Sequence, residues 1–127
     1  GSSQAVQLEQ VSFEIILHAG NARSSAMEAL QLVKHHECET GYQKIQEAES
    51  ELNQAHQAQT RLLQKEAQGA GLSPNLLLIH AQDQLMTAIT VKDLAKEMID
   101  LYQELGKGRE KGRSHLYVQP ECLRVYW

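Results

Sequence analysis

The sequence predicts an all-α fold for this chain of 127 residues: one domain that forms an antiparallel three-helix bundle. Long segments carry apolar or small residues in steps of three and four, as one face of a helix requires. Aromatic residues make up only 5% of the chain and prolines number 2, whereas strands favour aromatic and β-branched side chains. The length also corresponds to one ordinary domain rather than to a multidomain enzyme.

The first helix is expected over about residues 4–35. One face carries small or apolar positions in helical steps, namely Ala19, Ala22, Ala26, Leu30 and Val33. The middle of this segment consists mostly of short side chains and includes Gly20, which costs ~1 kcal/mol of helix propensity. The simplest reason for a glycine here is the close approach of a neighbouring backbone.

The second helix is expected after residues 36–39, where Thr40 and Gln43 resemble a capping box. Its apolar positions follow a heptad-like pattern with one polar exception, Gln59. These positions are Ile45, Ala48, Leu52, Ala55, Gln59 and Leu62. The glycine-containing segment 68–71 is expected to end the helix.

The third helix has the clearest start signal, since Ser73 can cap it and Pro74 can take the first helical position. Between Leu76 and Leu105 the apolar residues cover more than one stripe of this helix, which indicates burial on two sides. One side can face the first two helices. The other side predicts that chains associate through this helix.

A change in charge indicates a boundary at Gly106. Residues 1–105 contain 7 basic and 14 acidic side chains, whereas residues 106–127 contain 5 basic and 2 acidic ones. We therefore predict a helical domain over 1–105, followed by a basic tail over 106–127 that begins as a flexible linker and is non-native or poorly ordered. The alternative for this tail is an arm that binds a partner.

Charge, hydropathy and motifs exclude several classes of function. A net charge of −4 argues against a nucleic-acid-binding protein. No apolar stretch is long enough to span a membrane, and no secretory signal is visible. Cys38 and Cys122 lack metal-site spacing, so we expect free thiols in a reducing cytosol. Phosphate-loop, HExxH and GxSxG motifs are absent from the sequence.

His80 and Asp83 form the candidate site. On a helix, His80 shares a polar stripe with Asp83, Gln84 and Thr87. Histidine can act as a neutral nucleophile near pH 7, although a structural role fits the spacing equally well. If the helix lines an oligomer axis, copies of Asp83 converge and either take up protons or share a divalent cation such as Mg²⁺. An exposed helix aspartate is the simpler alternative.

The other histidines are expected to play structural roles. His18 and His56 are interpreted as hydrogen-bonded packing side chains within helices. His35 and His36 lie at a helix end, where an imidazolium suits the helix dipole. No role is assigned to His115 in the tail.

Three segments resemble the lactose/cellobiose-type IIA components of the bacterial sugar phosphotransferase system. They are residues 13–24 (FEIILHAGNARS), 52–60 (LNQAHQAQT) and 77–87 (LLIHAQDQLMT), and the resemblance covers about residues 8–105. It implies a cytoplasmic phosphocarrier. In this family the histidine that corresponds to His80 accepts a phosphoryl group from the phosphorylated histidine-containing carrier protein. It then passes the group to a cysteine of the IIB component during sugar uptake.

The resemblance also implies a homotrimer of nine helices in which Asp83 of three chains shares one metal ion, usually Mg²⁺. Gln84 stands where relatives commonly have histidine, so an acid–base role at that position is in doubt. Gln82, Gln84 and Thr87, or groups of an adjacent chain, are candidates to steady the phosphoryl oxygens. The resemblance gives no reason to expect nucleic-acid binding or direct membrane insertion.

Two other functions fit parts of the pattern. The first is a helical scaffold or adaptor without covalent chemistry, which would explain the heptad-like second helix. The second is a metal-dependent hydrolase that uses His80 and Asp83. Two ligands per chain form too small a metal site for the hydrolase.

Overall fold

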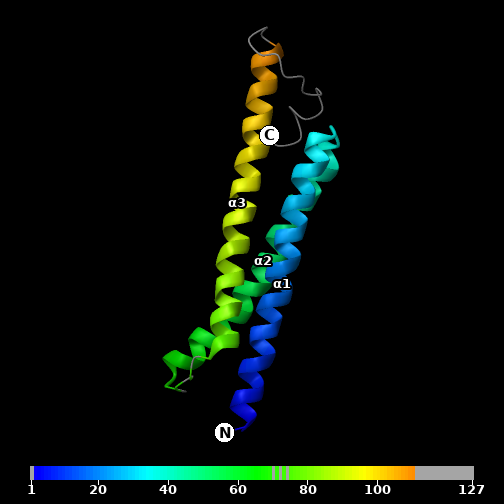
Figure 1. The fold of residues 1–127 in the computed structure, drawn as a ribbon. Coiled ribbons are helices and arrows are strands. Elements are labelled where there is room, and N and C mark those ends of the chain that lie inside the picture. Colours follow the sequence, from blue (N-terminus) through cyan, green and yellow to red (C-terminus); the bar gives the residue numbers. More distant parts are fainter. Residues whose placement is uncertain (1, 70, 72, 74, 111–127) are drawn as a thin grey trace.

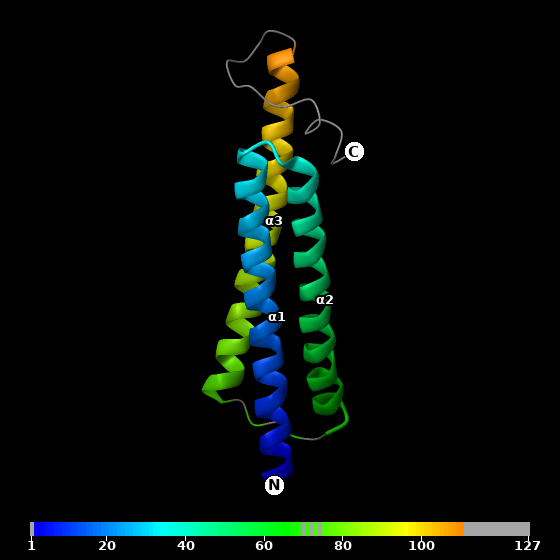
Figure 2. The same cartoon turned by 90° about the vertical axis from the view of Figure 1, so that its right-hand side faces the viewer.

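The computed structural model describes residues 2–69, 71, 73 and 75–110, and three long helices dominate it. Helix α1 spans Ser2–Lys34, α2 spans Cys38–Ala67 and α3 spans Leu76–Glu110. The first two run antiparallel, and α3 returns in the direction of α1 (Figures 1 and 2). The prediction of an all-α three-helix bundle is confirmed, while the assembly of three chains stays a prediction. Among the described residues, none of the helices is long and apolar enough to cross a bilayer.

Small side chains let α1 and α2 approach closely. Fully buried alanines occupy the facing surfaces, namely Ala22, Ala26 and Ala29 on α1 and Ala48, Ala55 and Ala58 on α2. At Gly41 the helices are close enough that an added Cβ atom would lie 2.9 Å from Cγ2 of Val33 and 3.2 Å from the carbonyl oxygen of Ala29. A Cβ atom at Gly20 would meet nothing within 4 Å. The close approach expected at Gly20 is therefore not made within the described part of the chain.

Polar side chains also join α1 to α2, and we call this contact the α1–α2 seam. Its ion pairs include Arg61 with Glu14 at 2.7 Å and His18 with Glu51 at 2.6 Å. Other cross-helix polar pairs of the described residues are Lys44 with Glu28 at 3.1 Å, Lys65 with Gln7 at 2.8 Å and Asn21 with Glu51 at 3.5 Å.

Helix α3 packs mainly against α1 and touches α2 less. Its inner face is buried at Ala81, Leu85, Ala88, Ala95 and Ile99. The opposite face, which we call the outer face of α3, leaves large apolar side chains exposed. These are Leu76, Ile79, Met86, Leu94, Met98 and Leu101. The structure thus confirms that α3 is apolar on more than its core side.

The helix ends differ in detail from the predicted ones. No side-chain hydrogen bond caps α2, which begins at Cys38, so the prediction of a capping box at Thr40 is wrong. At the start of α3, Oδ1 of Asn75 accepts a hydrogen bond from the backbone N–H of Leu78 at 2.8 Å. Asn75 therefore has the capping role predicted for Ser73, and Pro74 lies outside the described residues.

The C-terminal end of α3 extends farther than predicted, through Gly106 to Glu110. The first residues of the expected flexible linker are therefore helical, while the domain boundary itself stays a prediction. Residues 111–127 lie outside the described part of the chain. Cys38 is disulfide-bonded, so the prediction of a free thiol there is wrong. Cys122 is outside the described residues.

Candidate functional site

His80 lies in the second turn of α3 with an exposed side chain. No described residue forms a hydrogen bond or ion pair with its ring. A helix holds the Cα–Cβ direction of such a residue firmly while the imidazole nitrogens stay accessible. An accessible, well-placed imidazole is what a nucleophilic histidine needs.

Asp83 lies one turn beyond His80, on the outer face of α3. Ile79 and Met86 precede and follow it on the same stripe, and they are 51% and 57% exposed. Among the described residues, no cation pairs with this carboxylate, and no cluster of three or more His, Cys, Asp or Glu side chains could hold a metal ion. One chain therefore supplies a single carboxylate, which Ile79 and Met86 flank on the outer face.

Gln82 does not share the side of α3 that carries His80, because residues two apart on a helix do not face each other. Its Oε1 accepts a hydrogen bond from Nε2 of Gln59 on α2, at 2.7 Å. This amide pair joins α2 to α3 and orients Gln82 away from His80. Of the three polar residues proposed to steady a phosphoryl group, Gln84 and Thr87 remain candidates.

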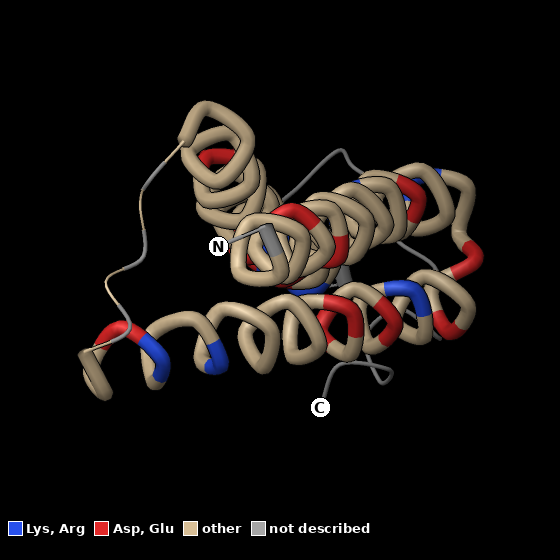
Figure 3. The backbone as a smooth tube through the Cα atoms, turned by 90° about the horizontal axis from the view of Figure 1, so that it is seen from below, with Lys and Arg blue, Asp and Glu red and all other residues tan. Residues whose placement is uncertain are grey.

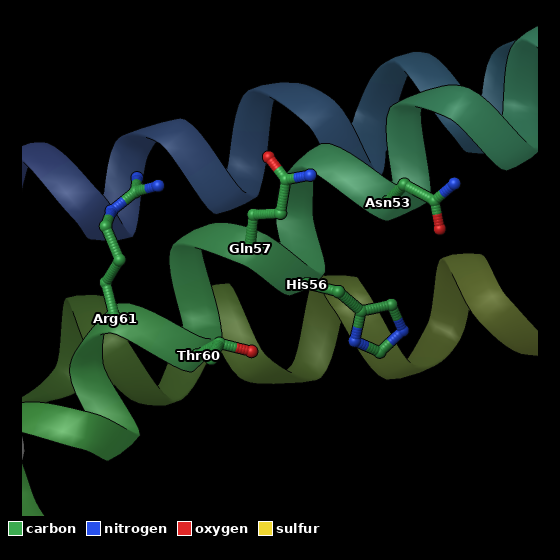
Figure 4. Close-up of a pocket in the computed structure, with 5 residues that line it drawn as sticks. All are labelled: Asn53, His56, Gln57, Thr60 and Arg61. Atoms are coloured by element: carbon green, nitrogen blue, oxygen red, sulfur yellow. The ribbon is translucent and has the colours of Figure 1, made fainter.

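Polar side chains also gather on the exposed surface of α2 nearby. They line a shallow cavity of about 410 Å³ and are Asn53, His56, Gln57, Thr60 and Arg61. His56 and Thr60 point towards α3, whereas Arg61 extends towards α1 (Figure 4). His56 is exposed, so its interpretation as a packing histidine is wrong. Within segment 52–60, polar side chains recur in steps of three and four residues. This pattern could have indicated the exposed polar surface of α2, and the sequence analysis missed it.

The remaining histidines of the described chain have partners. Nδ1 of His18 lies 2.6 Å from Glu51, as expected of a packing histidine. Nδ1 of His35 lies 2.7 Å from the carbonyl oxygen of Gln31. Nδ1 of His36 lies 3.2 Å from the hydroxyl of Tyr102. Only His80 and His56 combine exposure with freedom from hydrogen bonds among these described imidazoles.

The charge pattern of the bundle is mixed along its helices (Figure 3). Hydrogen bonds that the Lys44 ammonium donates to the carboxylates of Glu47 and Glu28 raise the pKa of Lys44, and burial raises the pKa of the Tyr102 hydroxyl.

Comparisons with known proteins give consistent results. The family model described as "PTS system, Lactose/Cellobiose specific IIA subunit" matches residues 10–103. The lichenan-specific phosphotransferase enzyme IIA component of Bacillus subtilis is 50% identical over 81% of this chain and 94% of its own length. The lactose-specific EIIA component of Staphylococcus epidermidis is 41% identical over 77% of this chain and 94% of its own.

A solved structure is similar as well. The crystal structure of the cellobiose-specific enzyme IIA from Bacillus anthracis superposes with a TM-score of 0.76 and 50% sequence identity. The similarity covers 79% of this chain and 92% of the other one. The part of this chain outside the similarity, about a fifth, is shorter than any one of the three helices, so the similarity reaches all three of them.

Proposed function

Since the chain belongs to the lactose/cellobiose-specific IIA family of the sugar phosphotransferase system, we propose that His80 is the residue that carries its phosphoryl group. Members of this family are phosphotransferase components, and the chain is accordingly a phosphocarrier in sugar uptake. This role implies contact with a phosphorylated histidine-containing carrier protein and with a IIB component. Neither a scaffold without covalent chemistry nor a metal-dependent hydrolase is supported by these relatives.

One observation supports His80 over the hydrogen-bonded histidines. Its ring is exposed and free of described partners, and it borders the outer face of α3, where large apolar side chains stay exposed. His18, His35 and His36 have hydrogen-bond partners that would have to be given up before their Nδ1 atoms could react. A phosphocarrier must present its imidazole to two different proteins in turn, so accessibility is essential.

The transfer needs little beyond alignment. One ring nitrogen of neutral His80 forms an N–P bond as the P–N bond to the histidine of the carrier protein breaks, and the electron pair returns to the donor imidazole. In the second step the thiolate of the IIB cysteine forms an S–P bond as the N–P bond to His80 breaks. Because the transition state is loose, the bundle contributes mainly by holding His80 in position.

We further propose that three chains associate through the outer face of α3. The exposed apolar side chains of this face form the kind of patch that marks an interaction surface. On a three-fold axis the three copies of Asp83 would converge, and their oxygen atoms suit Mg²⁺, with one ion per trimer. When bound, the ion would offset the repulsion among the carboxylates. A cytoplasmic location, where the carrier protein delivers phosphate, belongs to the same proposal.

The decisive experiment is a phosphate-transfer assay with phosphoenolpyruvate and the upstream phosphotransferase proteins. The native chain should gain the mass of one phosphate, and peptide mapping should place it on His80. His80→Ala should gain none while keeping its helical content. His35→Ala is the matched control, because this histidine is exposed at the opposite end of the bundle, and it should accept phosphate normally. Phosphorylation of His80→Ala would refute the assignment.

A further inference from the structure

A groove lies between α1 and α3 at the end of the bundle where α1 is joined to α2. Its volume is about 250 Å³, and the residues that line it include Met27, Leu30 and Lys34 of α1 and Met98 and Tyr102 of α3. Met27 is 46% exposed and Met98 is 51% exposed. The two helices therefore leave an apolar hollow open at this end of the bundle.

The walls of this groove suit an aromatic side chain. Methionine sulfurs make favourable contacts with aromatic rings, and Met27 and Met98 supply one from each helix. An ammonium group is attracted to the face of an aromatic ring, most strongly to that of tryptophan, and Lys34 supplies this group. Because a cavity of about 150 Å³ can hold benzene, the groove has room for one indole ring. Its chemistry therefore matches Trp127, the only tryptophan of the chain.

Cys38 lies at the same end of the bundle. It is the first residue of α2, four positions after Lys34, and its side chain is buried. One turn further along α2, Gly41 packs against Val33, which also lines the groove. The sulfur of Cys38 is disulfide-bonded, and Cys122 is the only other cysteine of the sequence. If the bond lies within one chain, it joins these two cysteines and brings Cys122 to the end that carries the groove.

The chain is long enough to make this connection. Helix α3 ends at Glu110, eight residues or about 12 Å beyond Tyr102. Cys122 is twelve positions further along the sequence, a length that spans up to about 40 Å when extended. From Cys122 to Trp127 the chain spans up to about 17 Å, whereas the groove follows α1 for only about 10 Å, over residues 27–34. Its length therefore allows both the disulfide and a contact of Trp127 with the groove.

We propose that a disulfide between Cys38 and Cys122 holds residues 111–127 against the bundle, with the indole of Trp127 packed in the groove between Met27 and Met98. Four of the five residues that follow Cys122 are apolar or aromatic, so their burial against the groove is favourable. The bond favours this segment over a second copy of the chain as the occupant, because it keeps the segment beside the groove at a high effective concentration.

The bond makes the docking of this segment dependent on redox conditions. It forms by exchange with a low-molecular-weight disulfide: the thiolate of Cys122 attacks one sulfur and releases one thiol, and the thiolate of Cys38 then attacks Cys122 Sγ and releases the second thiol. The two protein thiols are oxidised, the small disulfide is reduced by two electrons, and the protons pass to the released thiols. An excess of small thiols reverses both steps and frees the segment. The inference is independent of the proposed function, since it uses neither His80 nor Asp83.

The first test follows the fluorescence of Trp127 in the full chain. In the oxidised native chain the emission should lie at shorter wavelength, and iodide should quench it less, than in Cys122→Ser, because a packed indole is shielded from water and ions. Reduction with dithiothreitol should shift the native emission to that of Cys122→Ser. If the oxidised native chain and Cys122→Ser emit alike, the inference is wrong.

Two methionine variants locate the indole. Met98→Gln should lose the shift to shorter wavelength while keeping the disulfide, since Met98 lines the groove. Met86→Gln is the matched control, because Met86 is 57% exposed on the same helix and does not line the groove, and it should emit like the native chain. An unchanged emission in Met98→Gln, or an equal change in Met86→Gln as expected for an indole buried between two copies, would overturn the inference.

The last test identifies the bond itself. Isotope-labelled and unlabelled chains are mixed in reduced form, oxidised with oxidised glutathione and digested without reduction. Mass spectrometry should find Cys38 and Cys122 peptides linked in pairs that carry the label in both halves or in neither. Pairs labelled in one half would show a bond between two chains, and free thiols on both cysteines would show that no bond forms. Either result would contradict the inference.

Discussion

The α1–α2 seam and the outer face of α3 differ in how many of their side chains are buried or paired within the protomer. In the seam, alanines are fully buried, and ion pairs such as Arg61 with Glu14 cross between the helices. On the outer face, Ile79 and Met86 are about half exposed, and Asp83 between them has no described partner. The side chains of the seam therefore find their contacts within the chain, whereas those of the outer face stay exposed to solvent.

The seam therefore stabilises the fold, whereas the outer face is available for function. Exposed ion pairs contribute ~0–1 kcal/mol each, so the seam derives most of its stability from close alanine packing rather than from its charges. The outer face adds little to the stability of a single chain, because its apolar side chains stay in contact with water. Its residues are therefore free to serve assembly and phosphate transfer.

The sharpest test of this contrast compares two neighbouring residues of α3, one buried and one exposed. Leu85 is fully buried against the core, so Leu85→Ala should lower the free energy of unfolding by ~2–5 kcal/mol. Met86→Ala should leave the unfolding of a dilute, monomeric sample nearly unchanged. Urea denaturation followed by circular dichroism measures both variants.

The concentration dependence of the same denaturation curves provides the control. The loss caused by Leu85→Ala should be the same at every protein concentration, whereas Met86→Ala should weaken the extra stability that appears when the native chain associates. If Met86→Ala destabilised the monomer as much as Leu85→Ala does, the outer face would belong to the core and the contrast would fail.

The second prediction concerns the charge within the outer face. Asp83→Leu should keep the trimer and should tighten it in the absence of Mg²⁺, because it removes three converging like charges from an apolar surface. Sedimentation velocity over a dilution series in EDTA measures the difference from the native chain. Asp83→Asn, which removes the charge without adding apolar surface, should fall between the two. Dissociation of Asp83→Leu trimers would mean that the metal contributes more than the removal of charge.

The periodicity of the sequence was sufficient to predict the three helices, because each helix buries a stripe that repeats every three to four residues. Their ends were harder to predict. Helix α2 begins at Cys38, where the side chain is buried, and Gly41 packs against Val33 of α1. These contacts between helices fix the start, and no local capping pattern indicates them. Ser73 and Asn75 are both residue types that cap helices, so the sequence alone does not distinguish between them as the cap of α3.

The candidate site was likewise predictable from the sequence only in part. His80 and Asp83 stand out in the sequence because polar residues on a strongly apolar helix are visible in the pattern itself. The position of His56 is not visible there, since it depends on the register of α2 against α3 that the hydrogen bond between Gln59 and Gln82 reveals. The hydrogen bond that orients Gln82 away from His80 depends on the same register. Pairing between distant segments is the information that one sequence lacks.

The smallest expected effect lies inside the protomer, at Ser12. This side chain is fully buried in α1, and its hydroxyl oxygen has no hydrogen-bond partner. Ser12→Ala should therefore raise the free energy of unfolding by about 1 kcal/mol, because a buried polar group without a partner is removed and alanine is the better helix former. Ser25→Ala, at a partly exposed position of the same helix, should gain only the difference in helix propensity. Because Ser12 lies away from the surface proposed to assemble, its gain should be independent of protein concentration, and a gain that appeared only in the associated protein would place Ser12 at the interface instead.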